Sequence, residues 1–178
     1  MRLRPLCVVL MLLLAPTTAR ANDHVASIFG ALSFLTGSTH SGGHGTVEVA
    51  LPIAHPIHDD LGLLVDSSVH GGTDEGNSVT KATLMFGLRG LRRPHARLIL
   101  FAHFLGGFHR SQIGAAVDNG LAGSAGGGFD ILLGVAGRTP KPGTTGDPGW
   151  MLRFQSDWVR VAGENSARVS FGGGYRFK

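Results

Sequence analysis

The sequence has a single cysteine, few aromatic residues and no long helical pattern. Cys7 is the only cysteine among the 178 residues, and it lies before the end of an N-terminal apolar run. A chain that loses this region would have no disulfide, no thiolate nucleophile and no cysteine-based metal site. A lipid-modified cysteine would stand at the end of the run, behind small residues, so the position of Cys7 also argues against a lipoprotein.

The first 21 residues have the order of a secretory signal peptide. Two arginines precede the apolar run Leu6–Ala15, and the small-residue site Ala19-Arg20-Ala21 follows it. A basic region, an apolar stretch and an Ala-x-Ala site are the parts of such a signal. The run is far shorter than the roughly 20 residues of a membrane-spanning helix. We therefore predict a signal peptide over residues 1–21 and one mature domain over residues 22–178.

Removal of the signal also removes the basic excess of the chain. The full sequence has 16 Lys and Arg against 12 Asp and Glu, and three of the arginines lie in the signal. The mature chain therefore has 13 basic and 12 acidic residues, a net charge of +1. The basic character of the precursor is thus no evidence for nucleic-acid binding.

Short β-type runs follow the signal and alternate with clusters of Gly, Pro, Asn and Asp. We predict eight strands, most near the roughly 9–11 residues of a tilted membrane-crossing strand. Their ranges are 24–36, 45–54, 61–71, 79–90, 95–108, 121–136, 149–161 and 166–178. The clusters between them have turn chemistry, for example Ser41-Gly42-Gly43 and Arg92-Arg93-Pro94.

Within these runs an apolar face alternates with a mixed, charged face. A soluble barrel turns the apolar face inward, whereas a membrane barrel turns it toward lipid. Three features favour the membrane version: the export signal, the small residues on the polar faces, and the aromatic residues near strand ends. We predict an all-β fold, an eight-stranded antiparallel up-and-down transmembrane β-barrel. Its lipid-facing side chains would include Leu84, Phe86, Leu100 and Phe154.

The last predicted strand carries a resemblance. The segment Ala167–Phe177 ends in an aromatic residue and has Phe171 and Tyr175 at alternating positions before it. It resembles the C-terminal strand of outer-membrane barrels, and with Trp150–Arg160 it looks like the closing hairpin of small porin-family barrels of the outer-membrane protein A type. The resemblance implies a cell outer membrane location and a last strand that is read by the barrel-insertion machinery. The chain departs from the family pattern by ending at Lys178 rather than on the aromatic residue.

Eight strands with both termini in the periplasm would place alternate turns outside the cell. The predicted external turns lie near 37–43, 71–78, 109–120 and 162–165, and the predicted periplasmic turns lie near 54–60, 91–94 and 137–148. Long loops usually face outward and short turns inward. Here the stretch 138–149 is longer than the usual periplasmic turn.

The inward faces gather charges of both signs. The predicted inward set is Lys81, Arg89, Arg97, Arg153, Arg168 and Arg176 with Glu48, Asp66, Asp130 and Asp157. Side chains are just able to fill an eight-stranded barrel, and an unpaired buried charge is costly. We expect a paired network that plugs the barrel, with a small polar pore as the alternative.

Two further groups of polar residues are candidates for a metal site and for a catalytic triad. Four histidines fall near predicted external strand ends, beside two acids, but without a strong ligand spacing: His40, His44, His70 and His109 with Asp74 and Glu75. Ser67, Ser68 and His70 lie close to Asp66, but no sequence feature orients a catalytic triad. His55 and His58 flank Pro56 as turn residues, and Gly126-Gly127-Gly128 falls within a strand rather than in a phosphate loop.

The sequence therefore predicts an integral outer-membrane barrel with a structural or surface-interaction role and no catalytic, metal-binding or cofactor-binding residue. The expected partners are outer-membrane lipids and the barrel-insertion machinery, with no nucleic acid, and the expected state is a monomer. A lipid-modifying barrel enzyme and a soluble exported β-barrel that binds an apolar ligand are the alternatives.

Overall fold

The computed structural model describes residues 26–35, 40–51, 60–74, 76–95, 97–133, 148–161 and 163–177. The predicted signal peptide, His55, His58 and Glu75 lie outside the described residues. Within the described ranges no helix is long and apolar enough to cross a membrane.

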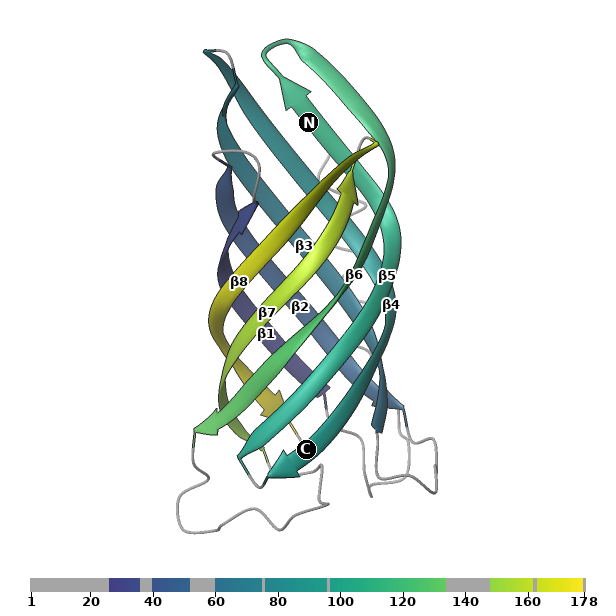
Figure 1. The fold of residues 1–178 in the computed structure, drawn as a ribbon, viewed down its shortest axis with the longest axis vertical. Helices are drawn as coiled ribbons and strands as arrows, with labels where there is room; N and C mark the ends of the chain where they lie inside the picture. The colour runs from purple at the N-terminus through teal and green to yellow at the C-terminus, as the bar shows by residue number, and fades with distance from the viewer. Residues whose placement is uncertain are drawn as a thin grey trace.

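Eight strands form one closed antiparallel barrel in which each strand pairs with its sequence neighbours (Figure 1). The strands are β1 (Ala26–Leu35), β2 (Ser41–Leu51), β3 (Asp60–Asp74), β4 (Asn77–His95), β5 (Leu98–Ile113), β6 (Ala116–Leu133), β7 (Gly149–Val161) and β8 (Glu164–Phe177). β8 pairs with β1, so that Ala26 lies opposite Phe177 and no edge remains open along the barrel wall. The predicted fold class, strand number and closing pair are confirmed.

The strand register sets the tilt of the strands relative to the barrel axis. A path across paired residues that starts at Leu91 of β4 runs once around the barrel and returns to β4 at Lys81, ten residues from its start. This stagger accompanies a strand tilt of roughly 35–45° and an interior that side chains can fill. The same stagger brings together inward side chains from strands that are far apart in sequence.

The two faces of every strand differ in the way the sequence predicts. Large apolar side chains lie on the outside of all eight strands, among them the predicted Leu84, Phe86, Leu100 and Phe154. Trp150 and Tyr175 pack edge to face near the end where β8 finishes, with ring centroids 5.2 Å apart. The buried polar and charged side chains point inward. The distribution is the reverse of a soluble barrel and matches the pattern of a membrane barrel.

Two predicted turns are strand residues instead. Ser41-Gly42-Gly43 belongs to β2, where it pairs with β1 and β3. A Cβ added at Gly42 would collide with the backbone of Val69 and His70 in β3. The glycine here permits close approach of two strands rather than a turn. Arg92-Arg93-Pro94 belongs to β4, whose pairing with β5 shifts register between Arg92 and His95. Such a bulge accommodates proline, which cannot donate a ladder hydrogen bond.

The predicted loops 71–78 and 109–120 are mostly strand as well. β5 runs to Ile113, and β6 starts at Ala116 after a two-residue turn in which Gly114 has φ 55°. The β3–β4 and β5–β6 hairpins rise above the end of β1 and the start of β2 (Figure 1). We call this end of the barrel the tip end, and the end where β1 begins and β8 finishes the terminal end.

Two strand edges stay open at the tip end among the described residues: a short one at residues 72–74 of β3, which pair with β4 alone, and a longer one on β6. The pairing of β6 with β7 begins at Ala122 and Val161, so residues 116–121 of β6 pair with β5 alone among the described residues. Strands β3 to β6 thus form a ribbon above the barrel wall, which we call the tip ribbon.

Candidate functional site

Four inward charges near the terminal end form the lower ion cluster: Glu48, Arg89, Asp130 and Arg153. Arg153 donates to both oxygens of Asp130, from Nε at 2.6 Å and from Nη2 at 2.9 Å. Arg89 donates to Asp130 Oδ2 at 3.0 Å and also pairs with Glu48. All four side chains are buried. Two positive and two negative charges therefore balance one another within a buried set of side chains.

Aromatic rings and glycines pack around the lower ion cluster. The Arg89 guanidinium lies 3.8 Å from the ring centroid of Phe101, and Arg153 lies 4.7 Å from that of Phe29. Such stacking stabilises a desolvated cation. Gly128 leaves space for Phe101, since an added Cβ would come within 2.9 Å of that ring. The lumen is thus filled at this level by arginine and aromatic side chains together.

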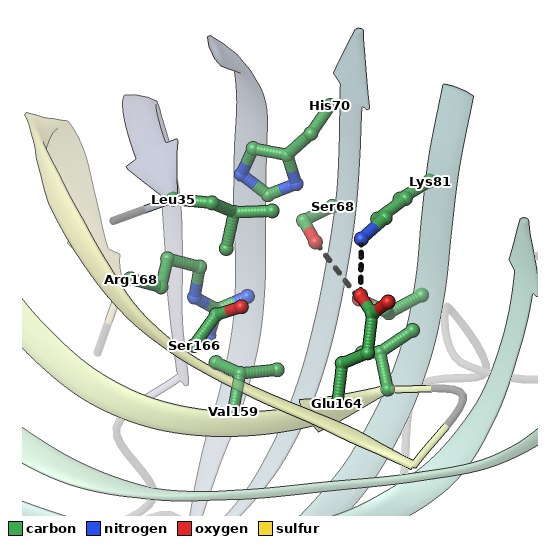
Figure 2. A pocket seen from close by; sticks show the side chains of 10 residues that line it. Leu35, Ser68, His70, Lys81, Val159, Glu164, Ser166 and Arg168 are labelled. Carbon is green, nitrogen blue, oxygen red and sulfur yellow. Dashed lines mark hydrogen bonds and ion pairs between the residues drawn. The ribbon is translucent and has the colours of Figure 1, made fainter. Parts of the chain in front are cut away.

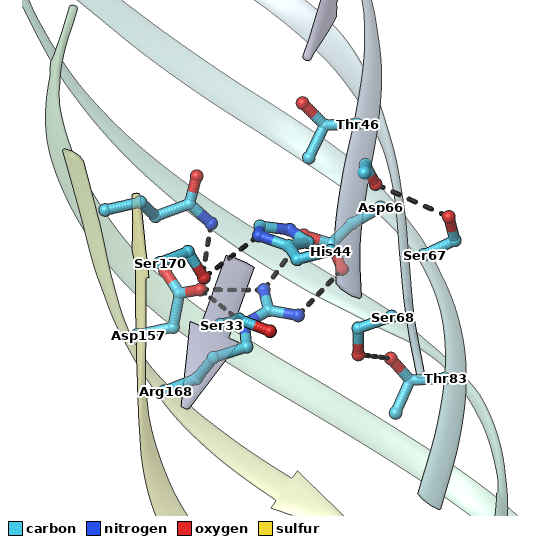
Figure 3. Close-up of polar contacts among 12 residues, drawn as sticks. Ser33, His44, Thr46, Asp66, Ser67, Ser68, Thr83, Asp157, Arg168 and Ser170 are labelled. Atoms are coloured by element: carbon cyan, nitrogen blue, oxygen red, sulfur yellow. Dashed lines mark hydrogen bonds and ion pairs between the residues drawn. The ribbon is translucent and has the colours of Figure 1, made fainter. Parts of the chain in front are cut away.

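A second set of charges, nearer the tip end, forms the upper ion cluster: Asp66, Asp157, Arg168, His44 and His103. Figure 3 shows the first four of these side chains. Arg168 lies between the two carboxylates. It donates to Asp66 at 3.0 and 2.9 Å and to Asp157 at 2.9 and 2.7 Å. His44 Nε2 lies 2.6 Å from Asp66 Oδ2, and His103 Nε2 lies 3.0 Å from Asp157 Oδ1. Two carboxylates here face one arginine and two imidazoles.

Ser170, His44 and Asp66 have the order of a catalytic triad. The Ser170 hydroxyl lies 3.0 Å from His44 Nδ1, and the other ring nitrogen contacts Asp66. Ser170 is 0% exposed, however, and Asp66 is also bound by Arg168. A nucleophile needs access to substrate, so this arrangement serves as packing within the upper ion cluster.

An ion pair lies across the tip end of the lumen. Lys81 Nζ donates to Glu164 Oε2 at 2.9 Å, from β4 to β8 (Figure 2). The hydrogen bond from Lys81, followed by its charge, lowers the pKa of the exposed Glu164 carboxyl. A cavity of about 20 Å³ beneath the pair, lined by His70 and Arg168 among others, has room for about one water molecule.

The structure places eight of the ten predicted inward charges in the buried lumen. Lys81 lies instead at the rim, half-buried. The assignment of Arg97 is wrong: it lies exposed in the turn before Leu98, where β5 starts three residues later than predicted. His103 and Gln155 are also buried in the lumen, although no role was predicted for them from the sequence. Both residues follow an outward-facing residue, Ala102 or Phe154, so the two-residue alternation of the strands could have placed them inside.

The four candidate metal histidines do not lie on the surface. All are buried, and His70 Nε2 lies 2.6 Å from the Ser33 hydroxyl. Across the described ranges, no three His, Cys, Asp or Glu side chains come together as a metal site. The candidate catalytic serines separate, because Ser67 faces outward and Ser68 pairs with Thr83 at 2.8 Å.

No protein-family model matches the chain, and no curated protein sequence matches it. Solved structures do. Ail, the attachment invasion locus protein of Yersinia pestis, is 12% identical with a TM-score of 0.52, over 86% of this chain and 97% of that one. Neisserial surface protein A is 10% identical with a TM-score of 0.54, over 87% and 95%. A structure of Ail in a phospholipid bilayer nanodisc is 10% identical with a TM-score of 0.50, over 88% and 100%. The chain therefore has the fold of the small eight-stranded outer-membrane β-barrels.

Proposed function

We propose that the mature protein is an integral outer-membrane protein whose barrel is a sealed scaffold for the tip ribbon, and whose role is interaction at the cell surface. The observation that carries the proposal is the inverted distribution of side chains. Apolar side chains cover the outside of all eight strands, while paired charges fill the inside. Burying that outer surface in lipid is strongly favourable, and leaving it in water is not.

The filled lumen supports a scaffold rather than a pore. Both ion clusters are buried, and the cavity between them and the rim ion pair holds about one water. We expect barrels reconstituted in planar bilayers to carry little steady current. Large, stable, ohmic channels would contradict the scaffold proposal.

The open edge of β6 supports a role in surface interaction. Unpaired backbone donors and acceptors on a strand edge can receive an extended segment of another protein as an additional strand. The edge at residues 116–121 carries Val117 and Leu121, both exposed. In such strand addition the backbone hydrogen bonds supply the affinity, and alternate side chains such as these supply the specificity.

Cysteine labelling tests location and orientation. The mature chain would contain no cysteine, so single substitutions report without background. We expect Val117→Cys, in the tip ribbon, to react with a membrane-impermeant maleimide on intact cells. Arg97→Cys, exposed at the terminal end, should react only after the outer membrane is made permeable. Equal labelling of both on intact cells, or recovery of the protein as a soluble species after osmotic release, would refute the proposed placement.

A photo-crosslinking amino acid tests the interaction edge. Placed at Val117 on living cells, it should give crosslinks to proteins at the surface. Thr80 is the matched control, because it is exposed on β4, which has a paired strand on both sides in the ribbon. Equal yields from the two positions would remove the open edge as the site of interaction.

A further inference from the structure

The outer surface of the barrel has a groove at the base of the tip ribbon, where the apolar band ends. Its volume is about 580 Å³, and it runs across β4, β5 and β6. The strand register arranges its outward side chains in two rows. Leu84, Phe108 and Leu121 form the lower row, and Ala82, Arg110 and Asn119 form the upper row.

The two rows have different chemistry. The lower row is apolar and open, with exposed fractions of 48%, 60% and 78% in the order given. The upper row presents the Arg110 guanidinium and the Asn119 amide. The third residue of this row, Ala82, has a small side chain, and the groove is hollow beside it because of that. Two residues along a strand separate the rows by about 6.6 Å. An apolar surface therefore meets a cationic, hydrogen-bonding one within the length of a lipid headgroup.

Arg110 is the first charged residue on the outward face of β5 above its apolar positions. It forms no ion pair with any acidic side chain in the described part of the chain. Its fork of N–H donors fits phosphate oxygens, and the Asn119 amide can donate beside it. A cation at the edge of an apolar band, outside the ion pairs of the described residues, is complementary to an anionic headgroup whose chains enter the band.

We propose that this groove binds one phosphate-bearing lipid of the membrane leaflet at the tip end. Its phosphate lies against Arg110 and Asn119, and one acyl chain lies along Leu84, Phe108 and Leu121. The site rests on the proposed membrane location, which the cysteine labelling tests separately. It adds to the scaffold a specific lipid contact at the lower end of the open edge of β6.

The test uses the full mature barrel folded in a non-ionic detergent, with bound lipid counted by native mass spectrometry. Three probes separate the parts of the ligand: dipalmitoyl phosphatidic acid, dipalmitoylglycerol without phosphate, and glycerol 3-phosphate without chains. We expect one tightly held phosphatidic acid and little retention of the other two. Arg110→Gln should lower its affinity about tenfold, the value of one charge-assisted contact.

Two further variants make the test specific. Ala82→Phe fills the hollow and keeps Arg110, so it should also weaken binding, by about fivefold. Arg160→Gln is the matched control, since Arg160 is likewise the first charged outward residue above the apolar positions of its strand, β7, but does not line the groove. It should change the affinity by less than about twofold. Equal losses for Arg110→Gln and Arg160→Gln, no effect of Ala82→Phe, or equal retention of dipalmitoylglycerol would each overturn the site. Because folding in detergent needs no bilayer, such a failure leaves the location proposal standing.

Discussion

Replacing Asp130 by asparagine would remove one charge from the lower ion cluster and keep its shape. Asp130 accepts hydrogen bonds from Arg89 and Arg153, and its side chain is 3% exposed. The variant leaves two buried arginines facing Glu48 alone, a net charge of +1 in a sealed space. Removing one partner of a buried ion pair typically costs about 3–5 kcal/mol. Glu48 lies 3.8 Å from Arg153 and offsets part of the loss, so we expect about 3 kcal/mol.

Denaturant unfolding in lipid vesicles measures this loss. The two tryptophans, Trp150 and Trp158, both face outward and report the transfer from lipid to water by fluorescence. Asp118→Asn is the matched control, because Asp118 is exposed in the tip ribbon and its change should stay within about 0.5 kcal/mol. Adding Arg153→Met to Asp130→Asn restores charge balance and should recover at least about half of the loss.

If Asp130→Asn costs less than about 1 kcal/mol and behaves like Asp118→Asn, water reaches the lower ion cluster and solvates its charges. The plug would then be a wet channel. If the double variant is no more stable than the single one, the loss comes from a distorted barrel and not from the unpaired charge.

Three other perturbations test the outer face, the rim and the closure. Phe86→Arg, near the middle of β4, should cost about 2–4 kcal/mol in vesicles, and Leu100→Arg, three residues into β5, should cost less; equal costs would contradict the depth of the apolar band. Glu164→Gln should lower stability at neutral pH by no more than about 1 kcal/mol. The hydrogen bond from Lys81 lowers the pKa of Glu164, so the stability difference between wild type and variant should be largest above the ordinary carboxyl pKa and should shrink as the pH falls below it. A stability difference that grows in acid would contradict this pairing. Deleting residues 173–178 removes half of the β8 pairing with β1 and should abolish the folded, heat-modifiable form seen on gels; full-yield barrel would refute the closing pair.

The number of strands and the direction of each face could be predicted because both depend on a period of two residues. An apolar residue at every second position is visible without knowledge of the partner strand, as at Leu84 and Phe86. The ends of the strands were harder to predict, since glycine and proline occur both in turns and at special positions within strands. Gly42 permits close strand approach, and Pro94 lies at a bulge, yet both read as turns in sequence. The upper part of the tip ribbon was missed because every residue from Gln112 to Asn119 is exposed, so that no alternation of buried and exposed positions remains there.

The charges of the lumen could be predicted, but their partners could not. Asp66 on β3 and Arg168 on β8 are 102 residues apart and meet only because the barrel closes with a stagger of ten residues. A different stagger would pair the same inward side chains differently. The charge balance of the lower ion cluster and the two imidazoles of the upper one are therefore properties of the register and not of any local motif.

The way the lumen is filled limits where the protein can meet a partner. A ligand in the barrel would have to displace Arg89, Arg153 or Arg168, each of which is buried and bound to a carboxylate. Exposing those charges without their partners costs several kcal/mol apiece, more than a small ligand readily recovers. The outer surface carries no such cost. Recognition is therefore expected on two outer features, the longer open strand edge, which lies on β6, and the groove at the lower end of that edge.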